Sequence, residues 1–318
     1  MISRRALVAS PLLLAPTLAN AQDFPSKPLR VVVPFAAGGG ADIVARLVAP
    51  RLGEVLEQPV VVENRAGAGG NLGAEAVMRA PADGHTLLLT SSAFAINPSL
   101  YRQIPYHPVR DFGPITRPAL MPNILVVPAS LPVRSVQELV EHAKSRSLSY
   151  ASAGVGTGTH LAGEMFKLQT GADLVHVPYR GGGAVVADLI AGRVALTFAT
   201  LPSVIEFVQN GQLRALAVTT AERWPSLPDV PTMQQIGFPD FEISTWIGLL
   251  APAGTPSRAV NQLHREVVRI IQLPEVRDRF ATLGMVTVGD TPEQFASFIN
   301  SELRMYERLV KASGASLE

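Results

Sequence analysis

The stretch Leu29–Asp42 reads LRVVVPFAAGGGAD, and it sets a pattern that the rest of the chain repeats. Its β-branched run predicts a short buried strand that ends at Pro34, because proline has no N–H group to donate to a sheet. A glycine loop follows. From Ile43 to Leu56 apolar residues recur at helical spacing, which predicts an amphipathic helix. The repeating unit is therefore a strand, a glycine loop and a helix.

Short strands and helices alternate in this way along the whole chain. After Pro59–Val62 and His85–Thr90 the pattern restarts at Asn123–Val127 and continues to Trp246–Leu250. Repeated alternation predicts an α/β fold with mostly parallel strands and right-handed crossovers. Two such blocks and a helical tail exceed one sheet of ordinary width. The sequence therefore predicts two α/β units.

Two arrangements of these units satisfy the pattern. In the simpler one, two independent domains follow each other. We favour a first lobe interrupted by a second, because the helices at the end of the chain need a sheet face to cover. We therefore expect residues 22–122 and 250–318 to form the first lobe, and residues 123–249 to form the inserted second lobe.

The composition excludes several classes of function. Of the 318 residues, 47% are hydrophobic and only 17% are charged, with a net charge of +1. This charge is too low for a surface that binds DNA or RNA, so we expect no nucleic-acid partner. The chain has no cysteine, which excludes disulfides, thiolate metal sites and a cysteine nucleophile.

The first residues have the pattern of a secretory signal peptide. Positive charge at Ser3–Arg5 precedes a short apolar stretch, and Ala19-Asn20-Ala21 supplies small residues at a cleavage site. We expect residues 1–21 to be removed on export to the periplasm, by the Sec route or by the twin-arginine route that paired arginines suggest. No later apolar stretch is long enough to predict a membrane-spanning helix.

Four loops that follow predicted strands are rich in glycine or hydroxyl groups: residues 34–42, 90–93, 152–160 and 178–183. Ligands of open α/β sheets bind at the carboxyl ends of strands. Glycine allows the backbone to approach a ligand closely, and free N–H groups at the start of the next helix suit an anion. These loops therefore predict a site that holds a carboxylate with main-chain amides and hydroxyls.

We select from these four loops the residues that lie near the start of the following helix. The candidate ligand-binding residues are Phe35, Ala36, Gly38, Gly39, Gly40, Asp42, Ser91, Ser92, Ala93, Ser152, Gly156, Thr157, His160 and Tyr179.

Other chemistry has weaker support. Gly67–Gly73 loosely imitates a dinucleotide-binding loop, but no acidic residue follows at the distance of about twenty residues that such a site uses. His160 and Glu164 lie one helical turn apart; we favour a loop-bonding histidine over a metal ligand. Arg65 and Arg180 suit a carboxylate clamp or a solvated surface equally well. We find no catalytic motif, and we expect no catalytic residue, cofactor or metal.

The order and spacing of many segments resemble the substrate-binding proteins of tripartite tricarboxylate transporters, the Bug family. The resemblance covers nearly all of the chain after residue 21. The segments that carry it are PFAAGGGAD at 34–42, VENRAGAGG at 62–70, INPSLY at 96–101, residues 150–161, HVPYRG at 176–181, LRALAVT at 213–219, LPDVPT at 227–232 and LAPAGTP at 250–256.

The resemblance implies a type II periplasmic-binding-protein fold, with two lobes, a hinge and a ligand cleft between them. It implies that the carboxylate lies between the loops at 35–42 and 152–160, with Ser91–Ala93 as a third contact. Tyr179 and Phe198 match pocket positions, and we add Thr200 beside them. The crossing strands should lie near 123–127 and 245–250. The implied partners are a small organic carboxylate and integral-membrane transporter subunits, and we expect a monomer.

One segment departs from the family pattern. Relatives commonly have DLMFDN where this chain reads Ala195-Leu196-Thr197-Phe198-Ala199-Thr200. An acidic side chain at position 199 would pair with a ligand ammonium group, and alanine does not. We therefore expect a di- or aromatic carboxylate rather than an amino acid. An exported hydrolase and a sensor that presents its ligand to a membrane kinase are the alternative functions.

Overall fold

The structure is a computed structural model that describes residues 24–313. The expected signal peptide, residues 1–21, lies outside the described residues. The strands are β1 (Leu29–Val33), β2 (Val60–Asn64), β3 (Thr86–Ser91), β4 (Phe112–Pro128), β5 (Leu148–Ser152), β6 (Leu174–Pro178), β7 (Leu196–Thr200), β8 (Leu213–Val218), β9 (Ser244–Pro252) and β10 (Val286–Thr287).

Helices follow most of these strands, as the sequence pattern predicts. They are α1 (Gly40–Leu56), α2 (Asn71–Met78), α3 (Ala93–Leu100), α4 (Val136–Ser145), α5 (Gly158–Thr170), α6 (Gly182–Ile190), α7 (Leu201–Gln209), α8 (Ser257–Ile271), α9 (Pro274–Thr282) and α10 (Pro292–Ser313), with short 3₁₀ turns η1 (Ala68–Gly70) and η2 (Gln234–Ile236).

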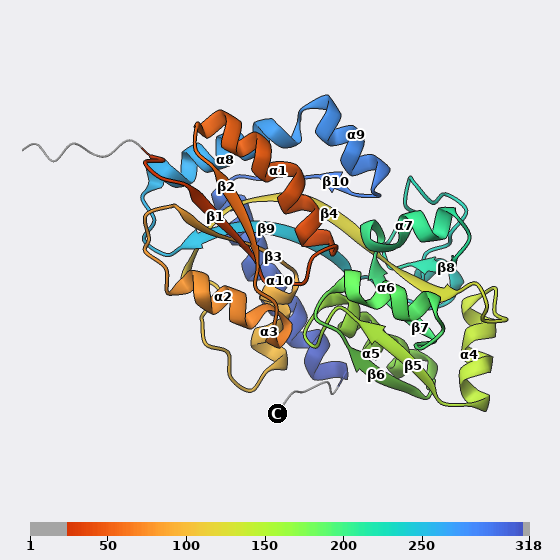
Figure 1. Cartoon of the computed structure of the whole chain (residues 1–318). Helices are drawn as coiled ribbons and strands as arrows, with labels where there is room; N and C mark the ends of the chain where they lie inside the picture. The colour runs from red at the N-terminus through yellow and green to blue at the C-terminus, as the bar shows by residue number, and fades with distance from the viewer. Residues whose placement is uncertain (1–23, 314–318) are drawn as a thin grey trace, which may run out of the picture.

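The strands form a two-lobed α/β molecule joined through the middle of its sheet (Figure 1). Along the sheet the order is β2-β1-β3-β9-β4-β7-β5-β6, with β8 and β10 also paired to β4. Within each lobe the outer strands are parallel, as expected. The strands that join the lobes are antiparallel to their neighbours, so the sheet is mixed rather than mostly parallel at its centre.

Strand β4 runs through both lobes. Its first part, Phe112–Pro122, pairs with β9 of the first lobe, and from Asn123 onward it pairs with β7 and β8 of the second lobe. The exchange of partners therefore falls between Pro122 and Asn123. Strand β9 pairs with β3 and with the first part of β4. These two strands connect the lobes side by side.

Helices cover both faces of the first-lobe sheet (Figure 1). Helix α1 packs against α8, and α2 contacts β3 on the opposite face beside α3. The long helix α10 contacts α3 and β4 and also α5 of the second lobe. The buried Trp246 of β9 donates from Nε1 to Glu302 of α10 at 2.8 Å. The end of the chain thus completes the core of the first half.

The sequence pattern missed three elements. Helix α3 contains Pro98 and is apolar on nearly every side, so it lacks the alternating faces that reveal a helix. The first part of β4 contains Pro114, Pro118 and Pro122, which favour a loop in sequence but here occupy a strand with register shifts against β9. The two-residue strand β10 is too short to produce a pattern.

A buried hydrogen-bond network lies where β4 crosses between the lobes. The fully buried Asn123 donates from Nδ2 to the Ile243 carbonyl at 3.1 Å and accepts from Thr245 Oγ1 at 2.8 Å. The Asn123 carbonyl accepts from the Thr219 N–H group at 3.0 Å and from its hydroxyl at 3.1 Å. One amide side chain therefore ties the start of β9 to the centre of β4.

We expect Asn123→Ala to lower the free energy of unfolding by about 1–3 kcal/mol, because it leaves buried polar groups without partners. Chemical denaturation of the ligand-free protein measures this change. The matched variant Asn210→Ala, at an exposed turn after α7, should change stability much less. Equal effects in the two variants would contradict the role assigned to Asn123.

Candidate functional site

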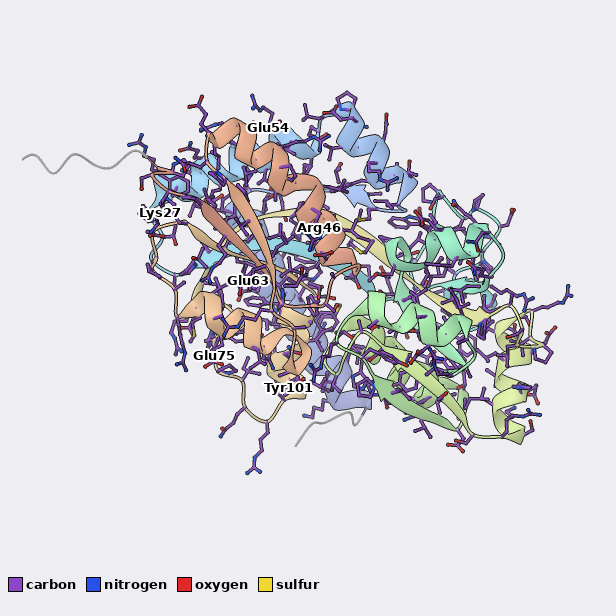
Figure 2. All side chains as sticks on the ribbon, in the orientation of Figure 1. Lys27, Arg46, Glu54, Glu63, Glu75 and Tyr101 are labelled. Carbon is purple, nitrogen blue, oxygen red and sulfur yellow. The ribbon has the colours of Figure 1, made fainter. Side chains whose placement is uncertain are left out.

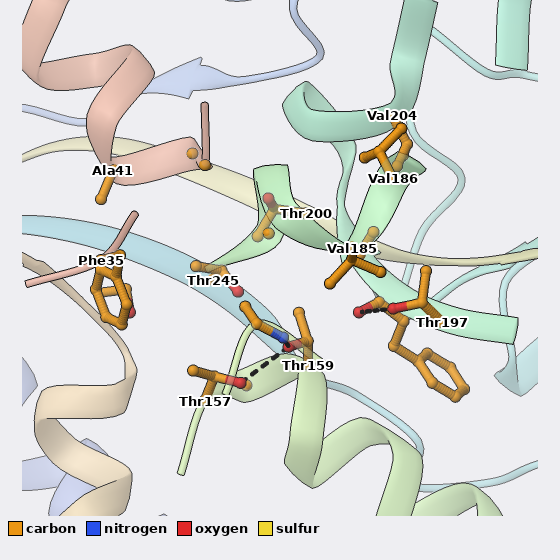
Figure 3. Close-up of a pocket in the computed structure, with 18 of the residues that line it drawn as sticks. Phe35, Ala41, Thr157, Thr159, Val185, Val186, Thr197, Thr200, Val204 and Thr245 are labelled. Atoms are coloured by element: carbon orange, nitrogen blue, oxygen red, sulfur yellow. Dashed lines mark hydrogen bonds between the residues drawn. The ribbon is translucent and has the colours of Figure 1, made fainter. Parts of the chain in front are cut away.

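A cavity lies between the two lobes, at the carboxyl ends of β1, β3, β5 and β7 (Figure 3). It encloses about 610 Å³ of space that no atom fills, including the part open to solvent. Residues from both lobes and from β9 line it: Phe35, Gly39, Gly40, Ala41, Ser91, Ala153, Thr157, Gly158, Thr159, Gly182, Val185, Val186, Thr197, Phe198, Ala199, Thr200, Val204, Thr245 and Ile247.

The N-terminal ends of four helices meet at this cavity. Gly40, Gly158 and Gly182 are the first residues of α1, α5 and α6, and Thr200 immediately precedes α7. No side chain caps the start of α1, α6 or α7. Unpaired N–H groups and the helix dipole give each of these ends partial positive charge. The cavity is therefore suited to an anion.

Glycine is required where the loops of the two lobes approach each other. The Ala36 N–H group of the first lobe donates to the Arg180 carbonyl of the second at 2.8 Å. A Cβ atom on Gly181 would lie 2.9 Å from that same Ala36 nitrogen, and Gly181 has a φ of 146°. A Cβ atom on Gly183 would lie 2.6 Å from the Ala37 carbonyl oxygen. The main chains of the lobes thus contact each other directly beside the cavity.

Hydroxyl groups supply the remaining polar atoms of the cavity. Thr157 accepts from the His160 N–H group at 3.3 Å and donates to the Gly154 carbonyl at 2.7 Å, which fixes the loop before α5. Ser91 and Thr245 face the same space from β3 and β9, and Figure 3 shows Thr245 between Thr157 and Thr200. None of the lining residues carries a charge.

Charged side chains lie elsewhere. Figure 2 shows Lys27, Glu54 and Glu75 pointing outward from the first lobe. Among residues 24–313 no three histidine or acidic side chains are grouped closely enough to hold a metal ion. No helix in this part of the chain is long and apolar enough to cross a membrane. The main-chain dipoles and hydroxyls are therefore the polar groups available to a ligand in the cavity.

The structure separates the predicted site residues into two groups. One group lines the cavity: Phe35, Gly39, Gly40, Ser91, Thr157, Phe198 and Thr200. The other group lies outside the lining, in or behind the same loops: Ala36, Gly38, Asp42, Ser92, Ala93, Ser152, Gly156, His160 and Tyr179.

Hydrogen bonds explain the positions of two polar residues in the second group. Asp42 is buried and accepts from the Gly38 N–H group at 2.9 Å, from Arg46 and from Asn64. Burial alone would raise the pKa of Asp42, but these hydrogen bonds lower it below its usual value. Asp42 therefore holds the glycine loop in place. The Tyr179 hydroxyl donates to Asp188 of helix α6 at 2.6 Å.

A second groove between the lobes contains the glycine stretch at 67–70 and Arg180, for which the sequence supports more than one role. Gly67–Gly70, Tyr101 and Arg180 line this groove, and Arg180 is absent from the lining of the cavity. The Tyr101 hydroxyl donates to the Val155 carbonyl across the lobes at 3.3 Å, and Figure 2 shows Tyr101 on the side that faces the second lobe. The glycine stretch forms part of this contact surface between the lobes.

Several lining residues escaped the sequence analysis. Thr159 and Thr245 carry hydroxyls, and Val185, Val186 and Val204 carry apolar side chains into the cavity. The valines look like ordinary core positions of helices. Thr159 lies in the predicted loop at 152–160, and Thr245 lies in a predicted crossing strand. Neither the residue type nor the spacing of these two threonines indicates that they line a cavity.

Two stacked histidines support the loop before α5. The rings of His160 and His176 lie 4.3 Å apart, and His176 Nε2 is 2.7 Å from Ser152 Oγ. The Gly156 N–H group donates to His160 Nδ1 at 3.4 Å. Burial, followed by the neighbouring His160, lowers the pKa of His176 to about 4. The loop is thus built on neutral imidazoles.

Comparison with solved structures identifies the class of this molecule. Periplasmic binding protein BugD superposes with a TM-score of 0.90 at 34% identity, over 93% of this chain and all of BugD. Rhodopseudomonas palustris Rpa4515, solved with adipate, gives 0.89 at 37% identity over 92% of this chain and 99% of that one. MatC from R. palustris, with bound malate, gives 0.87 at 32% identity over 90% of this chain and all of MatC. The fold is that of a two-lobed solute-binding protein.

The sequence comparisons name the family. The model of the tripartite tricarboxylate transporter family receptor matches residues 44–315. BugT of Bordetella pertussis is 38% identical over 303 residues, which cover 94% of this chain and 93% of BugT. A protein from the tcbD-tcbE intergenic region of a Pseudomonas species is 39% identical over 313 residues, 96% of this chain and 93% of that protein. This chain belongs to the tripartite tricarboxylate transporter receptor family, and its function is that of a solute-binding receptor. The resemblance seen in the sequence is confirmed.

The stability of the protein should fall as the pH decreases from about 6.5, the pKa of an unfolded histidine, towards 4, because His176 stays neutral in the folded state while the unfolded chain takes up a proton. Above this range His176 is neutral in both the folded and the unfolded state, so it contributes nothing to the pH dependence of stability. We expect His176→Gln to flatten the pH dependence of unfolding by denaturant. The variant His142→Gln on α4 serves as a control, and identical slopes in wild type and His176→Gln would refute the assignment.

Proposed function

We propose that this receptor holds the carboxylate of a small organic acid between its lobes, using main-chain N–H groups and hydroxyls. The observation that carries this proposal is the meeting of helix N-termini at a cavity whose lining contains no charged side chain. Adipate and malate in two related structures support a carboxylate as the class of ligand. The α1 and α5 ends, one from each lobe, supply the two halves of the anion site.

The energies are adequate for such a site. Hydrogen bonds to a charged group contribute about 1.5–3 kcal/mol each, and a helix terminus adds about 0.3–1 kcal/mol. A few such contacts, less the several kcal/mol that association costs, reach about −8 kcal/mol, which corresponds to micromolar affinity. We propose that the lining members of the predicted set contact the ligand and that the other members hold the loops that present it.

Lobe closure would complete the site. We propose a first lobe of residues 22–122 and 250–318 and a second lobe of residues 123–249, with β4 and β9 as the crossing strands. Each lobe offers half of the cradle, so only the closed arrangement makes every contact. A ligand that binds the closed arrangement better shifts the population towards it. The Ala36–Arg180 and Tyr101–Val155 hydrogen bonds belong to this closed arrangement.

The receptor would pass its ligand to integral-membrane transporter subunits without changing it. Family membership supports this delivery role over the hydrolase and the kinase-linked sensor. We further propose that the chain works as a monomer in the periplasm after export by the Sec or twin-arginine route. The ligand would lack an amine, because Ala199 offers no carboxylate to an ammonium group. Dicarboxylates and aromatic carboxylates both meet this condition.

A thermal-shift screen of small carboxylates tests the proposal. A ligand at 100 times its Kd adds about 2.7 kcal/mol to the free energy of unfolding, which is readily detected. We expect amine-free carboxylates to raise the melting temperature, and aspartate and glutamate to leave it unchanged. Mass spectrometry of the released ligand should recover it unaltered. Stabilisation by amino acids alone, or a chemically changed ligand, would disprove the proposal.

Replacing one lining hydroxyl should weaken binding more than it destabilises the empty protein, in which Ser91 Oγ accepts only one long hydrogen bond, from the Ala93 N–H group at 3.4 Å. We expect Ser91→Ala to raise the Kd for a carboxylate found in the screen about tenfold, the loss of one hydrogen bond to a charged group. Isothermal titration calorimetry measures this change. Ser301→Ala, on the exposed side of α10, is the control. An unchanged Kd in Ser91→Ala would place the carboxylate away from β3.

A further inference from the structure

The residues that line the second-lobe side and the middle of the cavity differ in chemistry, and the apolar Phe35 and Ala41 line its first-lobe side (Figure 3). We call one of these two regions the polar end, and it consists of Gly39, Gly40, Ser91, Thr157, Gly158, Thr159, Gly182, Thr200 and Thr245. We call the other the apolar end, and it consists of Val185, Val186, Ala199 and Val204. The ring of Phe198 points to the opposite face of β7 and packs against Phe166 and Phe241. In Figure 3 the three valines lie together, on the far side of Thr200 from Phe35 and Ala41.

The groups of the polar end are close neighbours. A Cβ atom on Gly40 would lie 3.4 Å from Thr200 Oγ1, and one on Gly39 would lie 3.6 Å from the Gly182 nitrogen. A Cβ atom on Gly158 would lie 3.3 Å from Thr245 Oγ1. The starts of α1, α5 and α6 are therefore each in close contact with a hydroxyl or an N–H group of a neighbouring segment. A carboxylate at this end of the cavity would meet several N–H and hydroxyl donors.

The apolar end follows from the direction of two helices. Helix α6 begins at Gly182 in the polar end, and Val185 and Val186 lie about one turn further along. Helix α7 begins after Thr200 in the polar end, and Val204 likewise lies about one turn further along. The part of a ligand that lies beyond the helix N-termini would therefore contact valine side chains, because N–H groups one turn into a helix are already hydrogen-bonded within it.

The one hydroxyl that borders the apolar end is already engaged. Thr197 is buried, and its Oγ1 donates to the Ala151 carbonyl at 2.8 Å within the sheet. Ala199, which stands beside it, carries no polar atom on its side chain. A charged group placed here would lose its water and gain no partner, which is strongly unfavourable. An apolar group would instead be stabilised by burial.

We infer that the ligand is a monocarboxylate whose body is uncharged and apolar, such as an aromatic ring or a short hydrocarbon chain. Its carboxylate occupies the polar end, and its body lies against Val185, Val186 and Val204. This inference rests on the proposed function and narrows it, because it selects an aromatic or aliphatic monoacid over a dicarboxylate. The cavity then distinguishes acids by the end that is remote from the carboxylate.

Matched pairs of acids test this inference by calorimetry on the purified protein. Benzoate is compared with terephthalate, and hexanoate with adipate, so that each pair differs only in a second carboxylate. We expect the better-binding monoacid to bind at least tenfold more tightly than its diacid. A diacid that binds equally well or better overturns the inference while leaving the carboxylate site intact. If none of the four acids binds but the screen finds a polar carboxylate that does, the inference fails and the proposed function stands. The proposed function fails only if no carboxylate in the screen binds.

Two variants locate the effect at the apolar end. Val186→Thr keeps the shape of the side chain but adds a hydroxyl, so we expect a loss of about fivefold in affinity for the monoacid. The matched variant Val175→Thr lies on β6, where the valine is 57% exposed, and should leave the affinity unchanged. Melting of both ligand-free variants shows that they are folded. Equal affinities in the two variants overturn the placement of the ligand body.

The variant Ala199→Leu provides an independent measurement by reducing the size of the apolar end. We expect it to weaken benzoate or hexanoate at least tenfold more than it weakens acetate, which has no body to accommodate. A uniform loss for all three acids would mean that the substitution disturbs the polar end, and it would overturn the assignment of Ala199 to the region that contacts the ligand body.

Discussion

The pairing of β4 with strands of both lobes is the constraint on which the rest of the structure depends. Because β4 is continuous, the loops that follow β1 and β3 are placed opposite those that follow β5 and β7. The buried Asn123 lies where the partner exchange occurs and binds both neighbouring chain segments. One hydrophobic cluster continues past this point, from Val32 and Leu88 in the first lobe to Phe166 in the second.

The placement of the loops gives the cavity several N–H donors and no charged side chain. Every helix start at the cavity follows a strand of one of the two lobes, so the parallel arrangement aims several dipoles at one volume. A salt bridge would pay the desolvation cost of two charges, whereas main-chain groups are fixed before the ligand arrives. The proposed carboxylate site would therefore rely on main-chain groups and hydroxyls, and the apolar end would select among acids.

Local signals made much of the fold predictable. The β-branched runs, the glycine loops and the Ser135 cap at the start of α4 depend on neighbouring residues, and the structure has the expected strands and helices there. The centre of the sheet was not predictable in the same way, because the prolines of β4 imitate a loop and its pairing depends on β9 more than a hundred residues later.

The candidate site shows the same division. The glycine loops identified the region of the cavity because a run of glycines indicates a place where the main chain closely approaches another group. The loops predict Asp42 and Tyr179 as ligand contacts, yet Asp42 binds Asn64 of β2 and Tyr179 binds Asp188 of α6, and these partners depend on the fold. The valines of α6 and α7 gave no signal, because a residue that lines a cavity and one that fills a core have the same sequence pattern.

The position of β9 also determines when the molecule is able to assemble. Strand β9 lies between β3 and β4, although some 115 residues separate it from the end of β4. The edges of β3 and β4 that face β9 therefore stay without a partner until Ser244–Pro252, nearly four-fifths of the way along the chain, joins the sheet. Open strand edges are prone to association with other chains. The first-lobe sheet is thus closed to such association only once this late segment lies in place.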